Sequence, residues 1–143
     1  MADFAGYDGK SNVPSEKRIV FKLFVDGANA PILAGYASAG VNTSGNPLNL
    51  YVASASRVSQ GLFRLTLTHA YKNHVSTMAH LNVNAAGQQR FCQPGPVANV
   101  GTSTPVTVDL FVVDNTGAVQ DPAAANANNF ISGEIVFADI AAC

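Results

Sequence analysis

The chain has 143 residues, the size of one domain with a substantial hydrophobic core. Its 8 basic and 9 acidic side chains nearly cancel, so its charge does not attract a polyanion and we expect no nucleic-acid partner. Charged residues make up only 12% of the chain, well below the ~25% of typical soluble domains. This favours a surface partly covered by copies of itself or by a larger assembly. The alternative is a β-rich module kept in solution by Asn, Ser, Thr and Gly.

The cellular compartment is predicted from three features. The N-terminal region is polar and has no apolar core segment, so we expect no signal peptide. No stretch approaches the ~18 consecutive apolar residues of a membrane span, so we expect no membrane partner. Cys92 and Cys143 are too few for a disulfide framework, and we interpret them as free thiols in a reducing compartment. These features predict a protein that is made and kept, or assembled, in cytoplasm.

Residues 1–17 show no periodicity, which predicts an extended N-terminal arm ahead of a single β-sandwich domain at residues 18–143. A frayed terminus is one interpretation of this arm. The other is an arm that becomes ordered on a neighbouring molecule through its aromatic side chains and the basic residues at its base. On that interpretation the partner-binding residues are Phe4, Tyr7, Lys17 and Arg18.

The main strands are predicted from a period of two, which turns alternate side chains toward a core. The clearest runs are 18–26, 61–71, 77–84, 106–113 and 130–138. The residues expected to face the core are Ile19, Phe21, Leu23, Val25, Phe63, Leu65, Leu67, Ala79, Leu81, Val83, Val106, Val108, Leu110, Val112, Ile131, Ile135 and Phe137. In the first run Phe24 makes the second face partly apolar too, which predicts a central strand between layers. Shorter strands are predicted at 32–36, 48–53 and 90–92.

The segments between these runs carry turn and loop signals. Residues 54–61 are predicted to be a polar link, 72–74 a turn between the flanking strands, and 88–103 a long irregular crossing. The sequence Asp-Asn-Thr-Gly at 114–117 has the chemistry of a turn, and Asp-Pro opens a possible short helical turn within 121–128. About seven or eight short strands predict an all-β protein, an antiparallel β-sandwich or jelly roll.

Three histidines, His69, His74 and His80, are the candidates for a metal site. Their separations fit no standard zinc pattern, and no pair of cysteines lies near them. His69 and His80 are expected toward the ends of adjacent antiparallel strands, where they could approach each other. Surface or hydrogen-bonded histidines are the preferred interpretation, so we predict no metal and no cofactor.

Carboxylates are the remaining candidates for catalysis. Asp109 and Glu134 are expected on outward faces and would oppose each other if their strands pair, unless the register separates them or Arg64 or Lys72 lies between. A glycosidase needs two carboxylates in a cleft lined with sugar-stacking groups, and the chain has no Trp. The sequence contains no nucleophile elbow, P-loop or dinucleotide fingerprint. We therefore predict no catalytic residues and no enzymatic activity.

A resemblance to known proteins is carried by GLFRLTLTHAY, MAHLNVNAAG, VTVDLFVVDNTGAVQDPAA and ISGEIVFADI, which span residues 61–140. This succession of strands, a D-x-x-G turn and a D-P-A segment resembles small β-sheet structural proteins of tailed-bacteriophage virions. In size and character the chain resembles the capsid decoration, or cement, class.

The resemblance implies a jelly-roll or sandwich domain on the capsid exterior of the virion, assembled in the host cytoplasm. Its partner would be the major capsid protein, and it would self-associate as a dimer or trimer. No family-specific binding motif is present, so the resemblance assigns no contact residue. A receptor- or sugar-binding β-sandwich of a phage tail or fibre is the alternative function.

Overall fold

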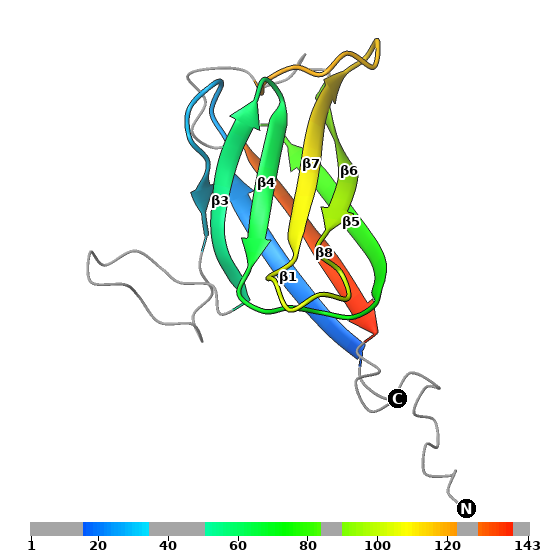
Figure 1. The fold of residues 1–143 in the computed structure, drawn as a ribbon. Coiled ribbons are helices and arrows are strands. Elements are labelled where there is room, and N and C mark those ends of the chain that lie inside the picture. Colours follow the sequence, from blue (N-terminus) through cyan, green and yellow to red (C-terminus); the bar gives the residue numbers. More distant parts are fainter. Residues whose placement is uncertain (1–15, 35–50, 84–89, 123–128, 139–143) are drawn as a thin grey trace, which may run out of the picture.

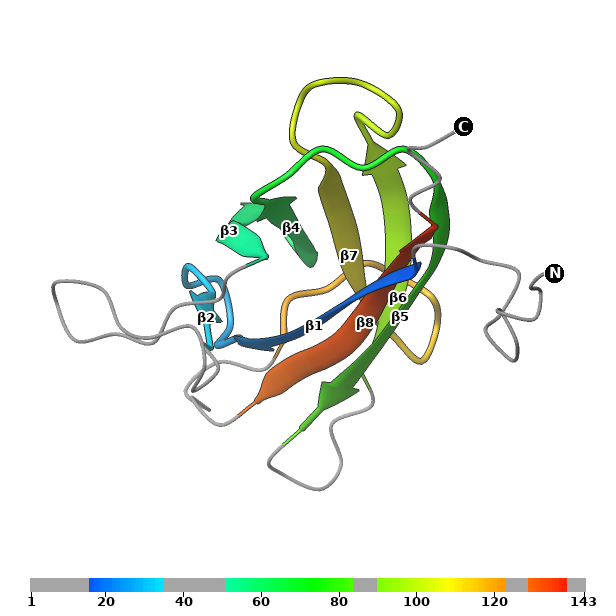
Figure 2. The same ribbon diagram turned by 90° about the horizontal axis from the view of Figure 1, so that it is seen from below.

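The computed structural model describes residues 16–34, 51–83, 90–122 and 129–138, and within them it contains eight β-strands. The strands are β1 (Glu16–Phe24), β2 (Ile32–Leu33), β3 (Val52–Ser59), β4 (Leu62–Leu67), β5 (His74–Asn82), β6 (Arg90–Ala98), β7 (Thr107–Asp114) and β8 (Phe130–Ala138). They form two four-stranded antiparallel sheets, with orders β2-β1-β8-β5 and β3-β4-β7-β6, packed one over the other (Figures 1 and 2). The predicted all-β sandwich is confirmed. The described segments contain no helix long and apolar enough to cross a membrane.

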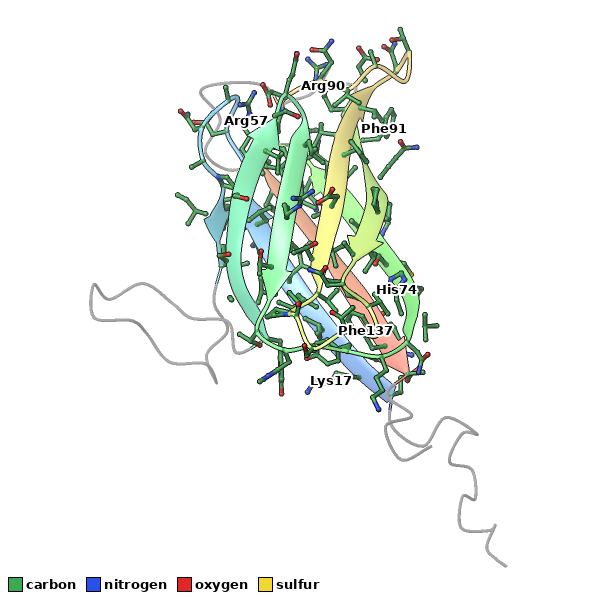
Figure 3. All side chains as sticks on the ribbon, viewed as in Figure 1. Lys17, Arg57, His74, Arg90, Phe91 and Phe137 are labelled. Carbon is green, nitrogen blue, oxygen red and sulfur yellow. The ribbon has the colours of Figure 1, made fainter. Side chains whose placement is uncertain are left out.

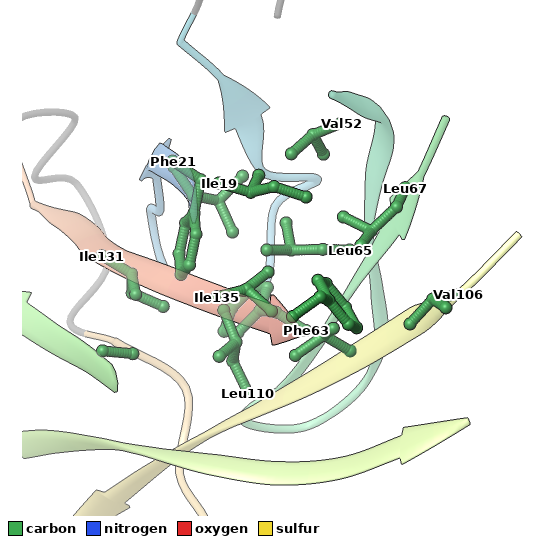
Figure 4. Close-up of a cluster of buried hydrophobic side chains, with 14 of the residues drawn as sticks. Ile19, Phe21, Val52, Phe63, Leu65, Leu67, Val106, Leu110, Ile131 and Ile135 are labelled. Atoms are coloured by element: carbon green, nitrogen blue, oxygen red, sulfur yellow. The ribbon is translucent and has the colours of Figure 1, made fainter. Parts of the chain in front are cut away.

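The core lies between the two sheets and is built by the predicted alternation. The inward-facing residues expected on β1, β4, β7 and β8 are all buried, and Ile19, Phe21, Phe63 and Leu110 are fully enclosed (Figure 4). Each such side chain contributes about 1.5–3 kcal/mol through removal of its apolar surface from water. Of the three core residues predicted for 77–84, Ala79 is buried, whereas Leu81 and Val83, the latter just after β5, are half-buried.

The segment 54–61 was predicted to be a polar link, and this is wrong. It forms most of β3 and the turn into β4, with Ala55 opposite Leu65 in the register. β3 is an edge strand, and its Ala and Ser side chains give no apolar alternation for a sequence pattern to detect. The turn requires Gly61, which has a φ of +65° and lies against Val119 and Gln120.

The segment 88–103 was predicted to be an irregular crossing with a brief strand at 90–92, and this is also wrong. β6 continues for nine residues, through Pro94 and Pro96. Proline is tolerated there because β6 is an edge strand, and the register shifts between Pro94 and Val97. The ring of Phe111 on β7 lies against Gly95, where an added Cβ would be 2.5 Å from its Cε2.

Two expected strand pairings are corrected by the sheet order. β4 and β5 were expected to form a hairpin through residues 72–74, yet they belong to different sheets, and His74 is already the first residue of β5. β7 and β8 also lie in different sheets, so Asp109 and Glu134 do not oppose each other. Apolar pattern identifies which side chains enter a core, but it does not say which of two packed sheets each strand joins.

The N-terminal strand pairs with the C-terminal one, and Glu16 lies opposite Ala138. Lys17, which was assigned to the arm, is therefore part of β1. Residues 1–15 lie outside the described part of the chain, as do 35–36 and 48–50 of the predicted short strands and 123–128 of the predicted helical turn. The predicted turn at 114–117 is present, closed by a hydrogen bond from the Gly117 N–H to the Asp114 carbonyl.

Candidate partner-binding surface

The outward side of the β2-β1-β8-β5 sheet is the candidate surface, and we call it the β1/β8 face. Register and burial assign to it Arg18, Val20, Lys22, Phe24, Ile32, Met78, His80, Phe130, Ser132 and Glu134. The strand 18–26 was expected to lie between layers because its second face is partly apolar. β1 is internal within its sheet, but no described layer covers this second face.

Large apolar side chains are exposed on the β1/β8 face. Val20, Met78 and Ile32 have exposed fractions of 53%, 55% and 68%. Val20 and Met78 each lie opposite Glu134, one on either side, so these three form a row across β1, β8 and β5. Single exposed apolar residues are ordinary, but several large ones on one sheet face are typical of a surface that another molecule covers.

The central residue of this row, Glu134, forms an ion pair with Arg18. Arg18 Nη1 donates a hydrogen bond to Glu134 Oε1 at 3.0 Å, and Arg18 Nε donates to Glu16 Oε1 at 3.2 Å. The hydrogen bond to Glu134 is the main reason that the pKa of the Arg18 guanidinium is raised. Exposed pairs of this kind add little to folding stability. They do set the charge pattern that an approaching partner meets.

An aromatic group stands further along β1 on the same face. The rings of Phe24 and Phe130 meet edge to face, with centroids 6.2 Å apart. Lys22 Nζ lies 4.2 Å from the centroid of Phe130 and 5.0 Å from that of Phe24. Ile32 on β2 is opposite Phe24. The ammonium group is therefore held over ring faces, and cation and apolar surface form one patch.

Two of the four predicted partner-binding residues lie in the described part of the chain, and they point to opposite sides of β1. Arg18 is on the β1/β8 face, whereas Lys17 turns to the other side of β1 and places its Nζ 3.6 Å from the ring centroid of Tyr51. Consecutive residues of a strand point to opposite faces, so the two basic residues could not both have met one flat partner. Phe4 and Tyr7 lie outside the described residues.

The outward side of the second sheet also carries charge, but there the charges bind one another. Arg64 Nε donates to Asp109 Oδ1 at 2.6 Å across the β4–β7 pair. Arg64 was considered only as a cation between Asp109 and Glu134, and Glu134 lies in the other sheet. Near the end of the sheet Arg57 donates to both carboxylate oxygens of Asp121, at 2.9 and 2.7 Å. These pairs join segments distant in sequence, so we assign them to the fold.

The Asp121 carboxylate is central to this end of the sandwich. The Gly61 N–H donates to its Oδ1 at 2.8 Å, and Arg90 Nε donates to its main-chain carbonyl. Arg57 and Arg90 lie at the same end of the sandwich (Figure 3). The hydrogen bonds from Arg57 are the largest cause of a lowered pKa for Asp121. The segment after the 114–117 turn is thereby tied to the β3–β4 turn.

The histidines lie in three different settings. His74 Nε2 is 2.8 Å from Thr77 Oγ1 with its ring edge-on to Phe137, His69 lies edge-on to Tyr71, and His80 is exposed on β5. The hairpin that was to bring His69 and His80 together does not exist. Among the described residues no three or more His, Cys, Asp or Glu side chains are grouped to hold a metal ion.

Comparison of the chain with models of protein families, with curated proteins and with solved structures gave no match. The two-sheet sandwich is the part of the virion-protein resemblance that the structure supports. The β1/β8 face was missed by sequence reasoning because its members come from four strands. Its one sequence signal was the apolar second face of 18–26, where Val20 and Phe24 stand.

Proposed function

We propose that the protein is a bacteriophage capsid decoration protein, which binds the outer surface of the head and stabilises contacts between major capsid proteins. The observation that carries the proposal is the β1/β8 face, with Val20 and Met78 exposed on either side of Glu134. Under this proposal the protein is located on the capsid exterior and is assembled in the host cytoplasm.

The composition of the chain supports a surface that is covered by capsid proteins. With only 12% charged residues, little charge has to lose its water when the surface is covered. Non-obligate interfaces mix apolar and polar groups. On the β1/β8 face the Arg18–Glu134 pair is such a polar element, with Glu134 between Val20 and Met78.

The mechanism requires no deep pocket. A specific interface of ordinary size buries about 1,200–2,000 Å² in total, which a sheet face and an extended arm can supply together. In this proposal the predicted arm, residues 1–17, adds its own contacts to those of the face. Many copies on one head would add their separate contributions to the stability of the shell.

Co-sedimentation tests the proposal. Purified protein is mixed with expanded heads of the phage that encodes it, and bound protein is measured after a density gradient. We expect saturable binding by the natural chain, and binding weakened roughly tenfold or more by Val20→Asp or Met78→Asp, since each buries a charge at the interface. Phe91→Asp is the matched control, because Phe91 is 56% exposed but lies on the other sheet.

The outcomes separate the claims. Absence of binding to expanded heads would overturn the function. Equal binding by all three variants would overturn the assignment of the β1/β8 face while leaving the function in place. Binding to a glycan array without binding to heads would favour the receptor- or sugar-binding alternative.

A further inference from the structure

Among the described residues of the β1/β8 face, Lys22 is the cation that has no carboxylate partner. The other cation, Arg18, is bonded to both Glu16 and Glu134. The strand register sets Lys22 opposite Ser132, and the one acidic residue of β8, Glu134, already accepts the hydrogen bond from Arg18. Lys22 therefore leaves a positive charge on this face for a partner to neutralise.

Two aromatic rings hold the Lys22 ammonium in place. Nζ lies 4.2 Å from the ring centroid of Phe130 and 5.0 Å from that of Phe24, and the side chain is half-buried. Ring faces attract a cation and replace part of its water, but they do not neutralise its charge. A cation held in this way binds a counter-charge more strongly than one on a free side chain, because less side-chain entropy is lost and screening by water is weaker.

Lys22 begins a polar row that crosses the sheet. Ser132 lies opposite Lys22 on β8, and the exposed His80 lies opposite Ser132 on β5. Each member of this row has an N–H or O–H group to donate, and none is acidic. Neighbouring strands are about 4.8 Å apart, so the row is about 10 Å wide, which fits a single acidic side chain. Along β1 the apolar Val20 and Phe24 flank the row.

We infer that Lys22 binds a carboxylate of the partner, an aspartate or glutamate with apolar residues on both sides of it, on the outer surface of the capsid protein. The inference rests on the proposed function, because it assigns the partner's chemistry at the same face. The apolar neighbours of the acidic residue match Val20 and Phe24. A nucleic acid would place further phosphates against Glu134 and these apolar side chains, and a sugar would have to stack on rings that already carry an ammonium group.

Co-sedimentation with expanded heads tests the inference through the charge at residue 22. Lys22→Glu is expected to weaken binding roughly tenfold or more, because it sets two carboxylates against each other. Lys22→Arg keeps the charge and the contact with the rings, so it is expected to bind within about threefold of the natural chain. The matched control is Lys72→Glu, which makes the same change of net charge at an exposed lysine between β4 and β5. It is expected to bind like the natural chain.

Ionic strength separates charge pairing from packing at the same residue. Lys22→Gln removes the charge and keeps much of the side chain. Raising NaCl from about 50 mM to about 500 mM screens an ion pair, so the affinity of the natural chain for heads should fall by a larger factor than that of Lys22→Gln. Thermal unfolding of each variant verifies that it is folded.

The outcomes distinguish this inference from the proposed function. A natural chain that does not bind expanded heads would overturn the function, and the inference with it. If the natural chain binds, undiminished binding by Lys22→Glu would overturn the inference alone. The same holds if Lys72→Glu or Lys22→Arg loses as much affinity as Lys22→Glu, or if the natural chain and Lys22→Gln depend equally on salt.

Discussion

Phe21 of β1 lies against Gly133 of β8, directly opposite it in the strand pair, and its ring fills the space of the missing side chain. A Cβ at residue 133 would be 2.9 Å from Phe21 Cζ and would also meet the main-chain oxygen of Met78. Because that oxygen belongs to the β5 ladder and cannot rotate away, Gly133→Ala is expected to lower the free energy of unfolding by about 1–3 kcal/mol. Urea unfolding of both proteins measures this loss of stability.

Gly95→Ala is the comparison for this prediction. A Cβ there would also press on a ring, that of Phe111, but Phe111 stands on the outer side of its sheet and is half-buried. Its side chain can turn toward solvent, so we expect a smaller loss of stability than at Gly133. Both glycines have ordinary strand backbone, so the comparison isolates the response of the neighbour. A loss at Gly95 equal to or greater than that at Gly133 would contradict this account of the packing.

The Arg64–Asp109 pair predicts an asymmetry between its two members. The Arg64 side chain is 41% exposed and that of Asp109 only 10%. Arg64→Ala leaves a largely buried carboxylate without its cation, whereas Asp109→Ala leaves a guanidinium that water can reach. We therefore expect Arg64→Ala to lower the urea midpoint more than Asp109→Ala does. The double variant should be no less stable than Arg64→Ala alone, and the opposite ranking of the singles would rule out this explanation.

Acid should weaken the ion pair between Arg57 and Asp121. The hydrogen bonds from Arg57 hold the folded-state pKa of Asp121 below its unfolded value of about 3.9, so its contribution to stability is complete above that pH. The contribution is lost as the pH falls through the folded-state pKa. Asp121→Asn lacks this titration, so its stability deficit relative to the natural chain should be largest near neutral pH and shrink below about pH 4. A stability deficit that stays constant as the pH falls would contradict a stabilising interaction between Arg57 and Asp121.

Cys92 provides a probe of the β6 edge. It faces the core opposite Val112, and burial raises the pKa of its thiol to about 12. Because the thiolate is the reactive form, alkylation at pH 8 should be slow in the folded protein and fast in urea. The experiment uses the Cys143→Ser variant, so that only the Cys92 thiol can be alkylated. Equally fast labelling in both conditions would show that β6 opens readily from the sheet.

The sequence predicted the strands whose inward residues are large. Ile19, Phe21 and Leu23 recur at every second position, as do Phe63, Leu65 and Leu67, so a period of two was visible and all six are buried. β3 and β6 were mispredicted because edge strands tolerate Ser, Ala, Gly and Pro, the residues that otherwise indicate loops.

The candidate surface was predictable only in part. One of the four predicted partner-binding residues, Arg18, does lie on the β1/β8 face. Met78 and Ile32 lie on the same face through strand pairings that no local sequence pattern specifies. The sequence offered Arg64 or Lys72 as a cation between Asp109 and Glu134, whereas predicting the pairing of Arg64 with Asp109 alone required knowing that β4 and β7 are neighbours. Contacts of this range depend on sheet order, which emerges from the packing of the whole chain.

The pairing of β1 with β8 has a consequence for how the protein is made. Arg18 and Glu134, which meet in the finished sheet, are 116 residues apart in the chain. On the ribosome β1 must wait until residues 130–138 have emerged, while β3, β4, β6 and β7 are available within residues 52–114. We expect the second sheet to assemble first and the sandwich to close only once β8 is available, because closing so long a loop is slow. Until then β1 has only the two-residue β2 as a partner strand, and this nascent stage is when the protein is most exposed to aggregation.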